Sequence, residues 1–386
     1  MHICIISNGY PTSQDPQYGC FEKDQAVALA KLGHKVSMLY VDRRVRPICE
    51  IIRKIGINSF SENGITIYRV VMFPFSVSRF ISGRLECYFC SIFLNRGLKK
   101  LIREGEKPDI IYAHFMYNIA YASYLKRKNN IPLVGMEHWS RLNEIPLSSD
   151  VRYLGNIAYC HTDLLISVAD SLRNLILKHF GKESVVIHNM IGDEFTNIPI
   201  KNIEERSFKF VSTGSLIHRK GFDILINALY EVRDMLPLWK LHVIGDGPER
   251  MALQKMIDDY GLSDHIVLLG RKTKKEIVEI LSMSDCFVLA SRAENFSVAI
   301  LEGMAAGLPV ISSDCGGIRE CVNEKNGIIV PVEDVHGLAD ALVEVSTTKG
   351  KYDRNQIKED CLKNYAPQNV AKRLLKMFDN VCQDKQ

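Results

Sequence analysis

The stretch SRAENFSVAILEGMAAGLPVISSDCGG, residues 291–317, joins a short apolar run to a segment rich in helix-forming residues. The preceding run CFVLA, residues 286–290, is typical of a buried parallel strand, and VAILEGMAAG predicts a helix with Ser297 at its N-cap. Glu294 is then expected in the connecting loop and Glu302 one turn into the helix. The stretch therefore predicts a strand, a loop and a helix, with a carboxylate on either side of the helix N-terminus.

This arrangement suits a diphosphate held between two hydroxyl-bearing rings. Backbone N–H groups in the first turn of a helix have no intrahelical partner and carry the positive end of the helix dipole, so they can hold an anion. A carboxylate can accept hydrogen bonds from a pair of vicinal hydroxyls, which suits Glu294 to a sugar and Glu302 to a ribose. The alternative is that both are ordinary solvated side chains, one in a loop and one on a helix surface.

A second run supplies positive charge. TGSLIHRKGFDIL, residues 213–225, follows the apolar strand FKFV and places Arg219 and Lys220 beside Gly221 at the start of a helix. Two cations at that place suit a phosphate. The run is not a P-loop, because the spacing G-x-x-x-x-G-K-[ST] does not occur in this chain.

Three further runs have the same strand-to-turn character. WKLHVIGDGPER, residues 239–250, ends a strand at Gly245 and Gly247, which permit close approach of the backbone to a ligand. HIVLLGRK, residues 265–272, supplies another strand and turn, and SDCGGIRECV, residues 313–322, supplies a Gly-Gly turn before a helix. Together with the run at residues 213–225, they favour a ligand-binding role for Glu294 and Glu302 over the solvated alternative.

Taken in order, the five runs resemble the donor-binding domain of glycosyltransferase family 4, retaining enzymes of the GT-B fold with many members in bacterial surface-polysaccharide synthesis. The resemblance covers about residues 208–345. It implies that Lys220 and Arg219 bind the diphosphate and that the loop at Gly270 and Arg271 lies near the nucleobase. The donor-binding residues that it implies are Gly19, Gly214, Gly245, Arg271, Glu294, Asn295, Phe296, Ser297, Val298 and Glu302, and the catalytic residues are Lys220, Arg219, Glu294 and His138.

Two departures from the family pattern keep other functions open. Many members carry two adjacent glycines in the first loop, whereas here Gly19 is followed by Cys20. Many also place an Arg about five residues before the motif Lys, where this chain has Ser215, so Arg219 is the candidate substitute. The alternatives are a sugar-nucleotide-binding scaffold protein with weak catalysis and a nucleotide-sugar isomerase of the same fold.

The resemblance implies an α/β architecture of two doubly wound, Rossmann-like domains that face each other across a cleft. The stretch HNMIGDEFTNIPIKN has the composition of a linker and predicts a division near residue 198. Residues 1–198 are then expected to bind the acceptor and residues 199–367 the nucleotide sugar. The final helix, about residues 368–386, is expected to pack back on the first domain.

Several short strands of the first half end in polar residues. PDIIYAHF ends near His114, and IPLVGMEHWS ends near Glu137 and His138. Ligands of open α/β sheets collect at the carboxyl ends of strands, so both His side chains are candidates to face a ligand, although a structural role is the alternative for each. The resemblance favours His138, because the family commonly has a His at the end of this strand. Glu22 and Lys23 are acceptor-binding candidates by position alone.

Composition agrees with two globular domains. The chain has 386 residues, of which 46% are apolar and 24% charged, and its 11 Cys residues are scattered without a disulfide-framework pattern. The pair in CYFC, residues 87–90, is expected to pack in the core. No apolar run is long enough to span a bilayer, and MHICIIS predicts a first strand instead of an export signal. These features favour a reducing, cytoplasmic location.

Positive charge is concentrated in one part of the first half. Residues 43–103 contain 12 basic and 3 acidic residues, interleaved with aromatic and aliphatic residues. Such a surface suits peripheral docking on the anionic inner face of the cytoplasmic membrane. The alternative is an amphipathic helix with an apolar face in the core and a solvated basic face. Nucleic acid is not an expected partner, because no nucleic-acid-binding motif accompanies the charge.

The expected reaction is transfer of a hexosyl group from a UDP- or GDP-sugar to a hydroxyl of a glycan or lipid-linked oligosaccharide, with retention at the anomeric carbon. No D-x-D motif stands at a predicted strand end, and no His or carboxylate cluster has metal-ligand spacing. The sequence therefore predicts no metal site, and no cofactor besides the nucleotide sugar.

Overall fold

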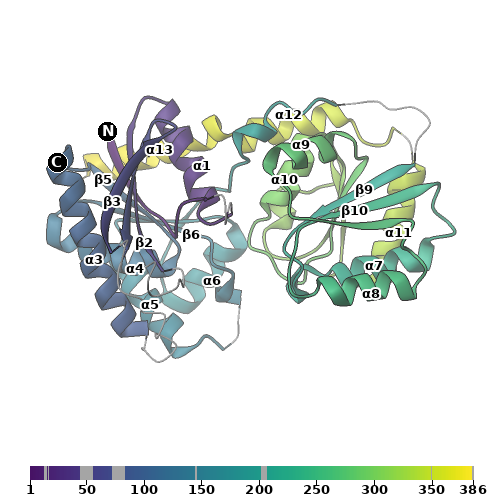
Figure 1. Cartoon of the computed structure of the whole chain (residues 1–386), viewed down its shortest axis with the longest axis horizontal. Helices are drawn as coiled ribbons and strands as arrows, with labels where there is room; N and C mark the ends of the chain where they lie inside the picture. Colours follow the sequence, from purple (N-terminus) through teal and green to yellow (C-terminus); the bar gives the residue numbers. More distant parts are fainter. Residues whose placement is uncertain are drawn as a thin grey trace. The chain divides into compact units, whose positions relative to one another are not determined.

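The computed structural model describes residues 1–12, 15, 17–43, 55–71, 83–143, 146–200, 207–348 and 350–384. The chain forms two compact units (Figure 1). Unit 1 consists of Met1–His188 together with Pro367–Gln386, and unit 2 consists of Asn189–Ala366. The final helix, α13 (Pro367–Gln383), thus belongs to unit 1, where its buried Phe378 lies 4.9 Å from the Tyr112 ring, between ring centroids.

The division between His188 and Asn189 lies ten residues before the division expected from composition. Asn189 donates a side-chain hydrogen bond of 3.1 Å to the carbonyl of Phe296, and the N–H of Ile191 donates one of 3.1 Å to the carbonyl of Tyr365. The linker-like stretch therefore packs on unit 2. Its Asn, Gly, Asp and Pro content does not reveal these hydrogen bonds.

Unit 1 is built on a sheet in which adjacent strands are parallel, apart from the antiparallel pair β3 and β4. Among the described residues its strand order is β3-β4-β2-β1-β5-β6-β7-β8. The strands are β1 (His2–Ile6), β2 (Lys35–Asp42), β3 (Gly56–Glu62), β4 (Ile65–Val71), β5 (Ile110–His114), β6 (Leu133–Glu137), β7 (Leu164–Ser167) and β8 (Val185–Val186). The α-helices of this unit, besides α13, are α1 (Cys20–Lys31), α3 (Gly83–Glu104), α4 (Met116–Asn129), α5 (Ser149–Cys160) and α6 (Asp170–Phe180).

Unit 2 contains a parallel sheet with the order β11-β10-β9-β12-β13-β14 in the part that the structure describes. The strands are β9 (Phe208–Thr213), β10 (Trp239–Ile244), β11 (Ile266–Gly270), β12 (Cys286–Leu289), β13 (Val310–Ser313) and β14 (Gly327–Val330). The helices are α7 (Phe222–Val232), α8 (Arg250–Asp259), α9 (Lys274–Ser282), α10 (Val298–Ala305), α11 (Val335–Thr347) and α12 (Arg354–Tyr365). Each unit is thus a doubly wound, Rossmann-like α/β domain, as the sequence predicted.

The decisive stretch folds as predicted. All residues of β12 are buried, which is expected for an apolar strand covered on both faces. Helix α10 begins at Val298 after Ser297 in the N-cap position, and it ends at Ala305. Glu294 lies in the loop between these two elements, and Glu302 lies on α10.

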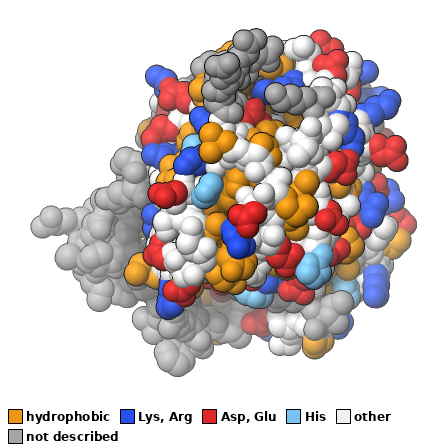
Figure 2. Space-filling view, turned by 90° about the vertical axis from the view of Figure 1, so that its right-hand side faces the viewer, with side chains coloured by type: hydrophobic (Ala, Val, Ile, Leu, Met, Phe, Trp, Pro, Cys, Tyr) orange, Lys and Arg blue, Asp and Glu red, His pale blue; other side chains and the backbone are white. Residues whose placement is uncertain are grey.

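Residues 201–386 contain 25 Lys and Arg against 27 Asp and Glu, and the surface of unit 2 shows this near balance of charge. Figure 2 shows the side on which α8 and α11 are drawn in Figure 1, and Lys, Arg, Asp and Glu side chains are interspersed over it. No helix of the described residues is long and apolar enough to cross a membrane.

Candidate functional site

The strand order of each unit places a ligand site at the carboxyl ends of two strands. In unit 2 the order reverses between β9 and β12, and in unit 1 it reverses between β1 and β5. Open α/β sheets bind ligands in the crevice at such a switch point, because the loops after the two strands diverge there. The loops that follow β9 and β12 carry Lys220 and Glu294, and the strand end of β5 carries His114.

A charged cluster forms at the switch point of unit 2. Lys220 Nζ donates a hydrogen bond to Glu294 Oε1, and Ser291 Oγ donates one of 2.9 Å to the same oxygen. Arg219 Nη1 lies 3.4 Å from Glu294 Oε2. Glu294 is only 8% exposed, so the cluster keeps a buried carboxylate compensated by two cations. The structure therefore brings together three residues that the sequence assigned to the site.

Backbone packing around this cluster requires glycine at several positions, among them Gly245 and Gly316. Gly245 has φ +143°, and a Cβ there would lie 1.8 Å from the carbonyl oxygen of Gly214. Gly316 has φ +62°, and a Cβ there would lie 1.9 Å from the carbonyl oxygen of Glu294. Any side chain at either position would displace the backbone beside Lys220 or Glu294. Gly214 itself lies against Lys220, since a Cβ there would be 3.5 Å from Lys220 Cδ.

The start of α10 differs from the sequence prediction in one detail. Ser297 occupies the N-cap position, but its side chain makes no capping hydrogen bond. Its hydroxyl is buried without a hydrogen-bond partner in the structure. The prediction of a side-chain cap was wrong, because occupying the N-cap position does not ensure that the hydroxyl points at the helix N–H groups. Asn295 and Phe296 are buried, and Val298 is half-buried.

The remaining predicted donor residues lie on neighbouring elements. Glu302 is half-buried on α10, and Arg271 is exposed just after β11, the edge strand of the sheet. The loops after β10 and β11 are joined by a hydrogen bond of 2.9 Å from the Gly245 N–H to the Gly270 carbonyl. Gly214 is joined to β10 by a hydrogen bond of 2.9 Å to the Ile244 carbonyl. Backbone hydrogen bonds therefore connect the glycine residues at the ends of β9, β10 and β11.

Arg292 is a residue of this site that the sequence did not single out. Its guanidinium donates to Asp223 at 2.7 and 2.9 Å, to Glu333 at 2.8 Å and to the His218 carbonyl at 2.6 Å. Its backbone N–H donates a hydrogen bond of 2.8 Å to the Arg219 carbonyl. Burial opposes the ionised form of Asp223, but the hydrogen bonds from Arg292 hold the pKa of that carboxyl below its usual range.

These contacts tie the turn that carries Arg219 and Lys220 to the loop that carries Glu294. Arg292 is thus a positioning residue for the charged cluster. Its place two residues before Glu294 was a signal in the sequence, but its partners are 69 and 41 residues away along the chain.

In unit 1, the loop after β1 packs closely against the start of α1. Gly19, the N-cap of α1, has φ +77°, and a Cβ there would lie 2.3 Å from the Gly9 carbonyl oxygen. Glu22 is buried and accepts a hydrogen bond of 3.0 Å from the Asn8 N–H, and burial raises the pKa of its carboxyl. Lys23 pairs with Glu62 at 3.0 Å. Glu22 therefore fixes the backbone of this loop, and Lys23 has a partner within unit 1.

The predicted histidines lie together at the carboxyl ends of β5 and β6. His114 Nδ1 is 3.1 Å from His138 Nε2, and the two rings are stacked. His114 is fully buried, and burial together with the neighbouring His138 lowers the pKa of its imidazole well below the usual range. His138 is half-buried, so it is the member of the pair with access to solvent.

Glu137 fixes the backbone on which His138 stands. It is fully buried, and its carboxylate accepts hydrogen bonds from the N–H groups of His138 (3.0 Å) and Trp139 (2.8 Å) and from the Tyr159 hydroxyl (2.7 Å). Burial raises the pKa of Glu137 to about 7. Its role is therefore to position the strand end, while His138 is the candidate to contact a ligand.

Other sequence predictions concern cysteines and metals. Cys87 and Cys90 are buried in α3, as expected for core packing. Among the described residues, no group of three or more His, Cys, Asp or Glu side chains is arranged to hold a metal ion.

The sequence matches two family models that together run from residue 23 to residue 360. The model of Glycosyltransferase Family 4 matches residues 23–195, and that of Glycosyl transferases group 1 matches residues 193–360. The chain belongs to glycosyltransferase family 4. The charged cluster of this family 4 enzyme lies in the second match, and the His114–His138 pair lies in the first.

The chain is also similar in sequence to known glycosyltransferases and in fold to solved structures. The Bacillus subtilis glycosyltransferase TuaC, provisionally named for teichuronic acid biosynthesis, is 26% identical over 377 residues, covering 92% of this chain and 90% of TuaC. Sucrose-phosphate synthase from Thermosynechococcus elongatus has a TM-score of 0.78 at 15% identity, and the match covers 99% of both chains. Anabaena HepE in complex with UDP and glucose has a TM-score of 0.73 at 16% identity, covering 98% of this chain and 99% of HepE. The predicted GT-B fold is thereby confirmed.

Proposed function

We propose that this family 4 enzyme transfers a hexosyl group from a UDP- or GDP-sugar to a hydroxyl of a glycan or lipid-linked oligosaccharide, in cell-surface polysaccharide synthesis. The main support is the cluster of Lys220, Arg219 and Glu294 at the switch point of unit 2. Two cations in contact with a buried carboxylate suit a ligand that joins an anionic diphosphate to a hydroxyl-bearing sugar. The UDP and glucose bound by HepE and the pathway named for TuaC are consistent with such a donor and product.

Each part of the donor has a proposed partner in unit 2. Lys220 and Arg219, with the N–H groups at the start of α10, stabilise the charge on the diphosphate. Glu294 accepts hydrogen bonds from the transferred sugar, Glu302 binds the ribose, and Arg271 lies near the nucleobase. The further donor contacts that we propose are Gly214, Gly245, Asn295, Phe296, Ser297 and Val298 in unit 2 and Gly19 in unit 1.

The proposed chemistry proceeds with retention. The bond between the anomeric carbon and the phosphate oxygen breaks, and the acceptor hydroxyl attacks that carbon from the same face. An oxygen of the leaving phosphate takes the proton of the acceptor hydroxyl, so no side chain is required as a base. Unit 1 binds the acceptor, and His138 orients the sugar or the acceptor. A His138→Ala variant should therefore be impaired but active.

The experiment that tests this proposal measures stereochemistry and metal dependence. A thermal-shift screen of nucleotide sugars identifies the donor first, since a ligand at 100 times its Kd stabilises the folded state by about 2.7 kcal/mol. NMR of the product should then show the anomeric configuration of the donor, and activity should survive a chelator, because fixed cations meet the leaving-group charge. An inverted product, or activity lost with chelator and restored by magnesium or manganese, contradicts the proposal.

The same assay separates transfer from the two rival functions. Release of the nucleoside diphosphate should depend on the acceptor, whereas a scaffold protein or an isomerase would show no such dependence. This comparison is needed because Cys20 and Ser215 depart from the family pattern.

We also propose that the enzyme docks reversibly on the cytoplasmic face of an anionic membrane through the region 43–103. Support comes from α3, where Leu85 and Tyr88 are 51% and 60% exposed within a segment of high positive charge. Exposed apolar side chains in a region with an excess of basic residues suit the interface of an anionic bilayer. Four basic residues of the region 43–103 that we also expect to contact the membrane lie outside the described residues, namely Arg44, Arg46, Arg53 and Lys54.

Arg43, another basic residue of this region, also has partners within unit 1. Its guanidinium donates hydrogen bonds of 3.0 Å to Glu86 and to Asn8, and it lies 4.6 Å from the centroid of the Tyr117 ring. Its charge is thus engaged within unit 1.

In liposome sedimentation, Leu85→Ser/Tyr88→Ser should lower the fraction of protein that pellets with anionic vesicles. The wild type should be released as salt rises, because the attraction decays over a Debye length of about 8–10 Å. The matched control is Met235→Ser/Leu238→Ser, which removes side chains that are 64% and 72% exposed in unit 2 and should pellet like the wild type. Equal pelleting of the wild type with neutral and anionic vesicles would count against docking.

A further inference from the structure

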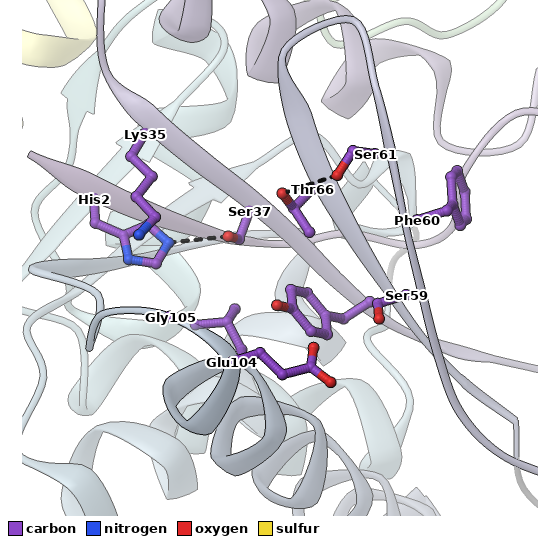
Figure 3. A pocket seen from close by; sticks show the side chains of 11 residues that line it. His2, Lys35, Ser37, Ser59, Phe60, Ser61, Thr66, Glu104 and Gly105 are labelled. Atoms are coloured by element: carbon purple, nitrogen blue, oxygen red, sulfur yellow. Dashed lines mark hydrogen bonds between the residues drawn. The ribbon is translucent and has the colours of Figure 1, made fainter.

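Unit 1 contains a pocket of about 330 Å³ at the amino ends of β1, β2 and β4, shown in Figure 3. The switch point of unit 1 lies at the carboxyl ends of β1 and β5, so the pocket is at the opposite edge of the sheet. Its volume is within the range of small-molecule sites, roughly 300–1,000 Å³. The pocket is therefore separate from the proposed acceptor site of this unit.

The pocket lies on a sheet face that carries a row of hydroxyl groups. The strand register pairs Ser37 with Thr66, Ser61 with Thr66 and Ser59 with Tyr68, and the alternation of side chains places these five on one face. Sheet faces covered by helices are normally lined by apolar residues. Ser37 is buried on this face, Thr66 is half-buried, and Ser59 and Ser61 are exposed on the edge strand β3, so the row of hydroxyls runs from the core to the surface.

Helix α3 covers the same face only in part. A Cβ on Gly97 would lie 2.5 Å from Leu39 Cδ1 and 3.0 Å from Val70 Cγ2, so α3 packs directly on β2 and β4 at that level. The helix ends at Glu104, and its last turn forms one wall of the pocket. The carbonyl end of a helix carries partial negative charge and accepts hydrogen bonds, which disfavours an anionic ligand and favours hydroxyl donors.

The charged side chains around the pocket balance each other. Lys35 and Glu104 stand on different sides of it in Figure 3. Each already has a surface partner at 3.5 Å, Glu106 for Lys35 and Lys100 for Glu104. One cation and one anion give the pocket no net charge to attract a phosphate or an ammonium group. Phe60 is turned away from the other lining side chains in the same view.

The hydroxyl groups retain hydrogen-bonding capacity. Ser61 Oγ and Thr66 Oγ1 are 3.4 Å apart, which is a weak hydrogen bond, and Ser37 Oγ is bonded to His2 Nε2 at 2.9 Å. A hydroxyl donates one hydrogen bond and accepts two, so each of these groups can serve an additional partner. A neutral ligand with several hydroxyls matches such a lining.

We propose that this pocket binds a neutral saccharide unit away from the reaction centre. Its occupant is a sugar ring of a glycan, held by Ser37, Ser59, Ser61 and Thr66 and by the carbonyl end of α3. The inference stands apart from the proposed transfer reaction, because it needs neither a nucleotide nor turnover.

The test is an NMR titration of the ¹⁵N-labelled full chain with methyl α-glucoside, methyl α-galactoside and methyl α-mannoside, with inorganic phosphate in parallel. At least one glycoside should cause saturable shifts at the amides of Ser37, Ser59, Ser61 and Thr66, while phosphate should not. Ser59→Leu/Ser61→Leu removes two hydroxyls and should weaken binding about tenfold, the effect of two ordinary hydrogen bonds. Thr66→Val, which keeps the side-chain shape, should weaken it in the same direction.

The matched control is Asn58→Leu, because Asn58 is exposed on the same edge strand but points to the opposite face. It should bind like the wild type. The proposal is overturned if none of the glycosides shifts these amides, if phosphate shifts them instead, or if Ser59→Leu/Ser61→Leu binds the glycoside with the Kd of the wild type. No donor enters the titration, so its outcome is independent of whether the enzyme transfers a sugar.

Discussion

Lys220→Ala should lower turnover by about 10²–10³-fold, which corresponds to about 2.7–4 kcal/mol of transition-state stabilisation. Lys220 Nζ is held against Glu294 Oε1 at the switch point of unit 2, where charge on the leaving diphosphate would develop. A preorganised cation of this kind acts most strongly in the transition state, so kcat should fall more than KM rises. Steady-state kinetics with the identified donor measure both constants.

The control for this prediction is Lys255→Ala. Lys255 is a surface residue of α8 whose side chain is 74% exposed and paired with Asp259, so its loss should leave turnover unchanged. A thermal-unfolding measurement on Lys220→Ala should show a folded protein, because the variant leaves Glu294 paired with Arg219. A folded Lys220→Ala enzyme with wild-type kcat would remove Lys220 from the proposed mechanism.

Glu302→Ala should weaken binding of the free nucleoside diphosphate by about 1.5–3 kcal/mol, the range for a hydrogen bond to a charged group. This corresponds to roughly 10- to 150-fold in Kd. The expectation follows from the place of Glu302 on α10, the helix whose N-terminus we propose for the diphosphate. Isothermal titration calorimetry measures the change, with the exposed Glu279→Ala on α9 as a control that should bind like the wild type.

Glu294→Ala should separate catalysis from nucleotide binding. Glu294 is proposed to contact the transferred sugar, so turnover should fall while affinity for the free nucleoside diphosphate is not weakened. The variant also frees Lys220 and Arg219 from their carboxylate partner, which leaves both cations available to the diphosphate. If calorimetry shows that Glu294→Ala and Glu302→Ala both bind the nucleotide like the wild type, the assignment of Glu302 to the ribose is wrong.

The candidate site was predictable where its signal is local. Arg219 and Lys220 directly precede Gly221 and α7, and Glu294 stands in a loop between an apolar strand and a helix-forming segment. Turn residues, apolar runs and caps act over a few neighbouring residues, so a single sequence reveals them. His138 was recognised in the same way, as a polar residue at a strand end.

Contacts between residues far apart in the sequence were not predicted. Arg292 interacts with Asp223 and Glu333, and Arg43 with Glu86 and Tyr117, which are far away in the sequence. These pairs meet only because the strand order brings their loops together.

The burial of individual polar side chains was not predictable from the sequence either. Glu22 was expected to bind acceptor, yet it is 2% exposed and bonded to the Asn8 backbone. The Ser297 hydroxyl was expected to cap α10, yet it makes no capping bond. Neither outcome follows from residue type, because both depend on what the surrounding elements cover.

The sequence by itself determined the α/β architecture, the order of strands and helices around residues 286–305, and the presence of two cations and two carboxylates suited to a sugar nucleotide. Only the tertiary structure decided that Lys220, Arg219 and Glu294 touch, that Arg292 holds their two loops, and that the chain divides between His188 and Asn189. The physical reason is the sequence separation over which each kind of interaction acts. Hydrophobic periodicity and turn chemistry act between near neighbours, whereas ion pairs, burial and unit boundaries depend on packing between segments tens of residues apart.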